Sequence, residues 1–140
     1  MTSRHLKRRT QGGFSLIEGL VSILIFSLGV MSLVSLQATS VRQSSNAKYR
    51  SDASLLANQL IGQMWVTDRT TATLQNFSTG GSTYTTWLAD VQAALPGSAA
   101  SAPTVAVTAA GQVTVDIYWK APNEEAATPA HRFTAIAQVK

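Results

Sequence analysis

The chain has 140 residues, enough for one ordinary domain or for a small domain on a long helix. Hydrophobic residues make up 45% of the sequence and charged residues only 13%, which excludes a disordered chain. The absence of cysteine excludes a disulfide, a thiolate metal site and a cysteine nucleophile. Because His5 and His131 are the only histidines, we expect neither a metal centre nor a cofactor.

The net charge of +4 originates at the N-terminus. Arg4, Lys7, Arg8 and Arg9 supply four of the eleven basic residues, and the seven that follow residue 13 balance the seven acidic residues. A protein that binds nucleic acid needs its basic patch on the folded part of the chain. We therefore expect no nucleic-acid contact by the C-terminal part of this protein.

An apolar run beginning GGFSLIEGLVSILIFSLGV follows the basic cluster. Between Phe14 and Leu36 only Glu18 is charged, and the 18 residues 19–36 carry no charge. A helix that spans the hydrocarbon core needs about 20 apolar residues, and a helix that is apolar on every face suits lipid or a filament core. The positive-inside rule places the N-terminus in the cytoplasm and the C-terminal part outside.

Three other interpretations of this run are possible. Arg8 and Arg9 form a twin arginine, but Thr-Gln-Gly-Gly rather than an apolar start follows them, so the pair is interpreted as ordinary basic leader. An ordinary secretory signal has an apolar region of about 7–15 residues and a small-x-small cleavage site, whereas this run is longer and lacks that site. A plain signal anchor explains the length but explains neither Glu18 nor the pair Gly12 and Gly13. Since a charged acid at the centre of a membrane helix costs about 2.5–3.5 kcal/mol, Glu18 requires a partner or a function.

Residues 4 to about 37 resemble the class III signal of type IV prepilins and related pseudopilins. The resemblance rests on the basic leader, then Gly13, then FSLIE, then about 18 apolar residues. It implies that a membrane aspartyl peptidase cuts between Gly13 and Phe14 on the cytoplasmic side and N-methylates Phe14. It also implies that Glu18 is an assembly residue, which meets the new amine of a neighbouring subunit as their helices pack in a filament core.

The position of Glu18 is physically compatible with this role. It lies near the cytoplasmic edge and in the first turn of the processed helix, where the helix dipole favours an anion. Cleavage creates a cationic amine on Phe14, and losing one partner of a buried ion pair leaves an uncompensated charge. The pair would therefore select register and reject unprocessed subunits. The alternative is a helix-capping glutamate without an assembly role.

No proline occurs before Pro96, so helix is allowed from Phe14 to about Val66, with Gly29 as the most flexible point. The sequence predicts a leader over 1–13, a transmembrane and assembly half over 14–36, a periplasmic half over 37–66 and a head over 67–140. Residues 49–69 further resemble PilV-type minor pilins. An amphipathic stripe in this stretch is predicted to pack against the head, and its members are Ala53, Leu56, Ala57, Leu60 and Met64.

The head has the pattern of a short helix followed by three strands. Residues 67–83 are rich in Thr and Ser and predict an exposed connection. Apolar residues at helical spacing then run from Tyr84 to Leu95 and stop at Pro96. Alternating runs begin at Val105, Val113 and Phe133, and predict an antiparallel meander. The fold class is therefore α+β and pilin-like. Glu124 and Glu125, in the loop before the last strand, are predicted to be solvated.

We find no catalytic pattern and predict a structural and assembly protein. It is expected to be a minor pilin that helps to initiate assembly and joins a type IV pilus, supporting adhesion and twitching motility. The implied partners are prepilin peptidase, other minor and major pilins, the inner-membrane assembly platform, a tip adhesin and, before assembly, membrane lipid. The protein would begin as a single-pass inner-membrane protein with a periplasmic head and end in the pilus at the cell surface. Two alternatives stay open: a minor pseudopilin of a type II secretion or DNA-uptake system, and a signal-anchored periplasmic binding module.

Overall fold

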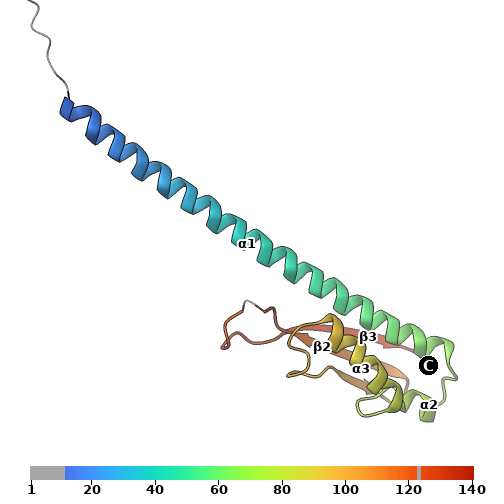
Figure 1. Ribbon diagram of the computed structural model, residues 1–140. Coiled ribbons are helices and arrows are strands. Elements are labelled where there is room, and N and C mark those ends of the chain that lie inside the picture. The colour runs from blue at the N-terminus through green and yellow to red at the C-terminus, as the bar shows by residue number, and fades with distance from the viewer. Residues whose placement is uncertain (1–11, 123) are drawn as a thin grey trace, which may run out of the picture. The chain divides into compact units, whose positions relative to one another are not determined.

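The computed structural model describes residues 12–122 and 124–140. By their contacts, the residues fall into two units that meet between Arg42 and Gln43. The elements in chain order are α1 (Gly12–Val66), α2 (Thr71–Gln75), α3 (Ser82–Ala94), β1 (Thr104–Val107), β2 (Gln112–Trp119) and β3 (His131–Gln138), as labelled in Figure 1. The predicted α+β architecture, a long N-terminal helix with a small antiparallel sheet, is confirmed.

The long helix α1 begins two residues before the predicted start at Phe14 and ends at Val66. Gly29, the expected flexible point, lies within continuous helix. The end of α1 is marked by Thr67, whose backbone N–H donates to the Gln63 carbonyl at 3.2 Å and whose hydroxyl donates to the Met64 carbonyl at 3.2 Å. These bonds satisfy carbonyl groups that a helix otherwise leaves without partners at its last turn.

The C-terminal part of α1 belongs to the second unit and contributes one face to its core. The sheet and α3 lie alongside this green part of the helix in Figure 1. Leu60 is fully buried, whereas Leu55, on another face, is 67% exposed. The buried α1 side chains of this core are Ala53, Leu56, Ala57, Leu60 and Met64.

The segment 67–83 differs from the predicted exposed connection. It contains the one-turn helix α2, with Thr70 as its N-cap accepting from the Thr73 backbone N–H at 3.3 Å. Leu74 and Phe77 from this segment are buried in the core. A single turn is too short to show helical periodicity in a sequence rich in Thr and Ser, so its two core residues were not predicted.

Helix α3 is tied to the rest of the core at both of its aromatic residues. The Trp87 indole N–H donates to the Leu56 carbonyl of α1 at 3.1 Å. The Tyr84 hydroxyl donates to the Pro103 carbonyl, just before β1, at 2.7 Å. Both rings are buried, so these bonds satisfy polar atoms that burial would otherwise leave without partners. The predicted helix is thereby confirmed together with its buried face.

The three strands form one antiparallel sheet in the order β1-β2-β3, which confirms the predicted meander. β1 pairs with β2 with Val105 opposite Val115, and β2 pairs with β3 with Val115 opposite Ala135. Gly111 adopts a φ of 84° at the turn between β1 and β2, a conformation that glycine alone adopts without steric cost. The side chains of β2 that point to the core are all buried, namely Val113, Val115, Ile117 and Trp119.

Candidate processing and assembly site

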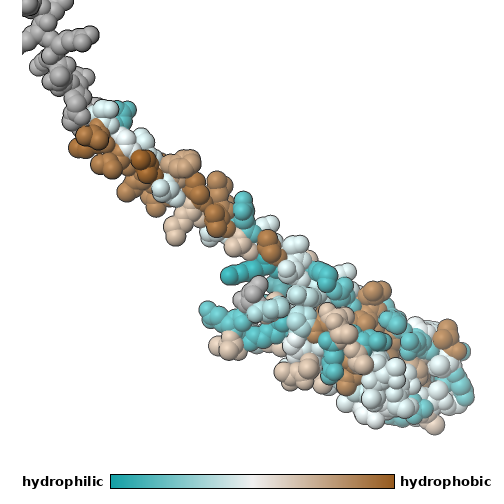
Figure 2. Space-filling model, viewed as in Figure 1, coloured by the Kyte–Doolittle hydropathy of each residue, from teal (hydrophilic) through white to brown (hydrophobic). Residues whose placement is uncertain are grey.

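The described part of the N-terminal unit exposes a largely apolar surface. Its helix contains an 18-residue window of mean hydropathy 2.3, none of which is buried, and by length and composition it can cross a membrane. Figure 2 shows these residues as a mostly brown band along α1, whereas the surface over the second unit is mainly white and teal with scattered brown patches. Large apolar side chains exposed to water at this density need lipid or other helices around them.

Polar side chains within this band bond to their own helix. The hydroxyls of Ser27, Ser32 and Thr39 donate to the carbonyls four residues earlier, at 2.7, 3.0 and 3.1 Å respectively. Such bonds reduce the cost of placing a hydroxyl in lipid, where no water is available as a partner. Glu18 is different because a carboxylate cannot donate to a helix carbonyl and carries a full charge.

The residues predicted for processing and assembly all lie near the start of one helix, α1. Gly13 and Phe14 belong to the first turn of α1, and Glu18 lies one turn beyond Phe14, about 6 Å along the axis. The uncut helix has no acid in its first turn, so Glu18 comes near the start of the helix only if the chain is cut before Phe14. The Glu18 side chain is exposed, and no basic group within the described residues forms an ion pair with it. The basic cluster of the leader lies outside the described residues.

The family model for the prokaryotic N-terminal methylation motif matches residues 8–34. This match includes Gly13, Phe14 and Glu18 and ends within the apolar band. Residues 8–34 therefore carry the N-terminal motif of a type IV prepilin-like protein. The motif implies a prepilin that a peptidase processes and that assembles with other pilins, and the proteins that carry it are structural. No curated protein and no solved structure matches the chain.

In the head of this prepilin-like chain, a polar cluster closes the loop between β2 and β3. The His131 Nε2 and a Glu124 carboxylate oxygen lie 2.6 Å apart, and the other Glu124 oxygen accepts from the Ala121 backbone N–H at 3.1 Å. The His131 ring stacks on Trp119 with centroids 5.6 Å apart. Lys120 Nζ donates to the Ala126 carbonyl at 2.8 Å, which adds a second tie across the loop.

Glu124 was predicted to be solvated, and the structure corrects this prediction. Its side chain is only 18% exposed because it pairs with His131. The hydrogen bond from His131 is the main reason why the pKa of Glu124 lies below its ordinary value. Glu124 lies in a loop without regular structure and His131 begins β3, so neither helical nor strand periodicity relates the two groups. Elsewhere in the head, burial raises the pKa of the Tyr84 hydroxyl.

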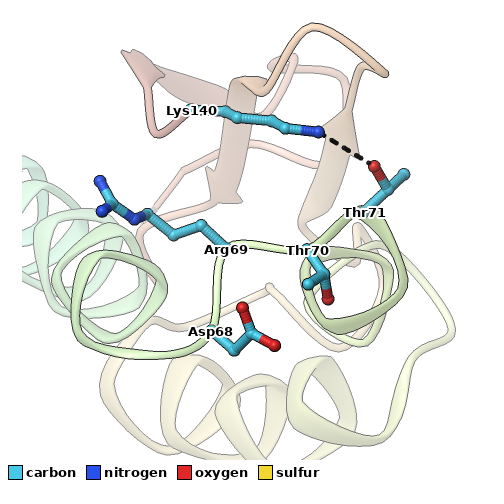
Figure 3. Close-up of a pocket in the computed structure, with 5 residues that line it drawn as sticks. All are labelled: Asp68, Arg69, Thr70, Thr71 and Lys140. Atoms are coloured by element: carbon cyan, nitrogen blue, oxygen red, sulfur yellow. Dashed lines mark hydrogen bonds between the residues drawn. The ribbon is translucent and has the colours of Figure 1, made fainter.

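A hollow in the head is lined by Asp68, Arg69, Thr70, Thr71 and Lys140. Lys140 Nζ donates to the Thr71 hydroxyl at 3.4 Å, while Asp68 and Arg69 point in different directions (Figure 3). The hollow is open to solvent, and its side chains do not converge on one point. No cluster of His, Asp or Glu suited to a metal ion occurs among the residues that the structure describes.

Proposed function

We propose that this chain is a minor pilin of a type IV pilus. Hydrolysis of the peptide bond between Gly13 and Phe14 would release the leader 1–13 and leave a free amine on Phe14. The same peptidase would then transfer a methyl group to that amine. The segments 14–36, 37–66 and 67–140 would act as assembly helix, periplasmic helix and surface-exposed head.

One observation carries this proposal. Glu18 is the single charge between Phe14 and Leu36, in a helix that is long and apolar enough to span a membrane, and it lies inside the methylation motif, one turn after Phe14. A charge in that setting is tolerated near the membrane edge but is not stabilised there. The cationic amine of a neighbouring, already processed subunit is a partner of the right charge at the right depth.

The minor role, rather than that of the bulk subunit, is supported by the sequence around the stripe. Residues 49–69 resemble PilV-type minor pilins, and the head is small, with a single three-stranded sheet. In this role the protein would help to initiate assembly and enter the filament with the other pilins. Adhesion and motility would then be properties of the whole pilus to which it contributes.

Deletion of the coding sequence and analysis of sheared pili test this function. We expect fewer pili on the deletion strain, and we expect the chain in sheared pili at a small fraction of the abundance of the major subunit. Unchanged piliation together with confinement of the chain to membranes would contradict the proposal. Normal piliation with a loss of protein secretion would instead assign the chain to a secretion system.

A further inference from the structure

The two edges of the head sheet are treated differently. The Thr108 N–H donates to the Gln112 carbonyl at 2.9 Å, so Thr108 and Gln112 form a hydrogen-bonded pair. Because such pairs alternate along an antiparallel ladder, the even-numbered residues of β1 are the ones that bond to β2. Val105 and Val107 therefore direct their backbone groups away from β2. Whether those groups find partners decides whether this edge is closed.

The β1 edge is closed by the segment after α2. The Thr79 backbone N–H donates to the Val105 carbonyl at 3.0 Å, and the Val105 N–H donates to the Thr79 hydroxyl at 2.8 Å. The Gln75 side-chain amide donates to the Val107 carbonyl at 3.4 Å. Natural proteins cover edge strands in this way because unpaired backbone groups invite pairing with another chain.

The β3 edge is open. The Val139 N–H donates to the Gly111 carbonyl at 2.9 Å, so the odd-numbered residues of β3 bond to β2 and the even-numbered residues face outward. Within the part of the chain that the structure describes, no backbone or side-chain group bonds to these outward backbone groups. The residues that present them are Arg132, Thr134, Ile136 and Gln138.

The side chains of β3 itself are incompletely covered, and none of them is acidic. Phe133, Ala135 and Ala137 on the inner face are only half-buried, whereas the inner residues of β2 are buried. On the outer face Ile136 is 65% exposed. The chain from residue 126 to residue 140 contains no Asp or Glu, and the Arg132 side chain is 63% exposed.

We propose that the open edge of β3 binds an extended strand of a neighbouring, different subunit and so extends the sheet to four strands. This inference rests on the proposed function, because a neighbouring subunit exists only in an assembly. Alternate residues of the eight-residue strand β3 direct a backbone N–H donor and a C=O acceptor outward, and an extended backbone can pair with this pattern. The incoming strand would carry a carboxylate opposite Arg132 and apolar side chains that cover Ala135 and Ala137.

Charge distinguishes this partner from a second copy of the chain. A second β3 would bring another Arg132 and no carboxylate, and cross-strand pairs of opposite charge are stabilising whereas like charges are not. The nearest carboxylate, Asp116, already accepts a hydrogen bond from the Thr134 hydroxyl and lies 3.9 Å from Arg132 Nε. The Arg132 side chain stays 63% exposed in this ion pair, so a carboxylate of the partner strand can approach the same guanidinium from outside the sheet.

Two proline substitutions distinguish the outward-facing backbone groups of β3 from those that bond to β2. Thr134→Pro removes an outward N–H, whereas Ala135→Pro removes an N–H bonded to β2. Thr134→Val serves as the matched control, because it keeps the N–H and the β-branched shape while losing the hydroxyl. In full-length protein we expect Thr134→Pro to be processed normally and to unfold near the temperature of Thr134→Val, and we expect Ala135→Pro to unfold earlier.

The readout is the content of the chain in sheared pili. We expect the content of Thr134→Pro in sheared pili to be about tenfold lower than that of Thr134→Val. A decrease of this size corresponds to the loss of about one hydrogen bond together with the steric effect of the proline ring. Equal content of the two variants would overturn the inference. If wild-type protein itself were absent from pili, the proposed function would fail first and this inference with it, a result distinct from a defect of the proline variant alone.

Amide hydrogen exchange provides a measurement that needs no variant. In the detergent-solubilised full chain, the amides of Arg132, Thr134, Ile136 and Gln138 should exchange faster than those of Phe133, Ala135 and Ala137. In pili all seven should be protected, and continued fast exchange of the four outward amides would overturn the inference.

A photo-crosslinking p-benzoylphenylalanine at position 136 identifies the occupant. A crosslink to an extended segment of a different pilin-like subunit supports the inference, whereas a crosslink to a second copy of this chain contradicts it.

Discussion

At the scale of single residues, Glu18 stands apart because no basic group among the described residues forms an ion pair with it. Serine and threonine hydroxyls of the same helix bond to carbonyls of the preceding turn. A carboxylate has no such option, so its free energy in lipid or in a filament core depends on a cation from elsewhere. The amine that cleavage would create on Phe14 is such a cation, and it does not exist in the uncut chain.

Substitution of Glu18 by glutamine tests whether its charge matters. Glu18→Gln keeps the size and hydrogen-bonding capacity of the side chain, so we expect normal membrane insertion and normal removal of the leader. Its content in pili should fall by at least about a hundredfold, because an unpaired buried charge costs about 3–5 kcal/mol. Glu18→Asp, which keeps the charge on a shorter stem, should retain more of the wild-type content. Wild-type content of Glu18→Gln in pili would show that the charge has no assembly role.

Glu124 gives the head a predictable dependence on pH. Its hydrogen bond from His131 holds the pKa in the folded protein below the ordinary value of 4.5. A carboxyl group whose pKa is lowered by folding stabilises the fold above its unfolded pKa, and this contribution is lost as the pH falls through the folded pKa.

We therefore expect Glu124→Gln to lower the unfolding temperature of the head at pH 6. Between pH 6 and pH 3 the unfolding temperature of the wild type should fall by more than that of the variant, as measured by circular dichroism. Parallel curves for the two proteins would mean that the Glu124–His131 contact does not contribute to stability.

The two residues differ in how far the sequence could predict them. Glu18 is conspicuous because it interrupts a run without other charges, so composition alone draws attention to it. Glu124 lies in a polar loop, and only the folded hairpin brings its carboxylate to His131. A contact of this kind depends on loop conformation, which residue patterns do not specify.

At the scale of elements, α1 serves two environments with one continuous helix. Before Arg42 all described side chains are exposed and mostly apolar. After Gln43 one face is buried against the head and the other faces are mostly polar, with Leu55, Trp65 and Val66 as exposed apolar exceptions. The periodicity of the second part was readable in the sequence because it persists over three turns. The single turn of α2 gives no such signal, and the burial of Leu74 and Phe77 depends on tertiary contacts.

The head should depend on the part of α1 that belongs to its unit. A head of this size without disulfides has a small core, and Leu60 of α1 is fully buried in it. In a fragment comprising residues 43–140, Leu60→Ala should lower the free energy of unfolding by about 2–5 kcal/mol, as measured by denaturant titration.

Leu55→Ala provides the matched control for that measurement. Leu55 lies on the same helix and is 67% exposed, so its truncation should change the free energy of unfolding by less than about 0.5 kcal/mol. The polar variant Leu60→Asn should destabilise the head at least as strongly as Leu60→Ala, since it buries an amide. Equal stability of the Leu60 and Leu55 variants would show that the head does not rely on α1.

At the scale of the whole molecule, the chain combines a long N-terminal helix, apolar in its first part, with a small α+β head. The methylation motif and the apolar band are local in sequence, so both were predictable from residues 4–37. The alternating runs predicted three strands in an antiparallel meander, and the structure gives their order as β1-β2-β3. The closed edge of β1 was not predictable because it depends on hydrogen bonds between Thr79 and Val105, which are distant in sequence.

The most direct test of the account is the N-terminal residue of the protein recovered from sheared pili and from membranes. Intact mass and N-terminal peptide analysis should find a chain that begins with N-methylated Phe14 in pili, with unprocessed chain confined to the membrane fraction. A chain that keeps residues 1–13 in both fractions, or that begins at any residue other than Phe14, would contradict the account.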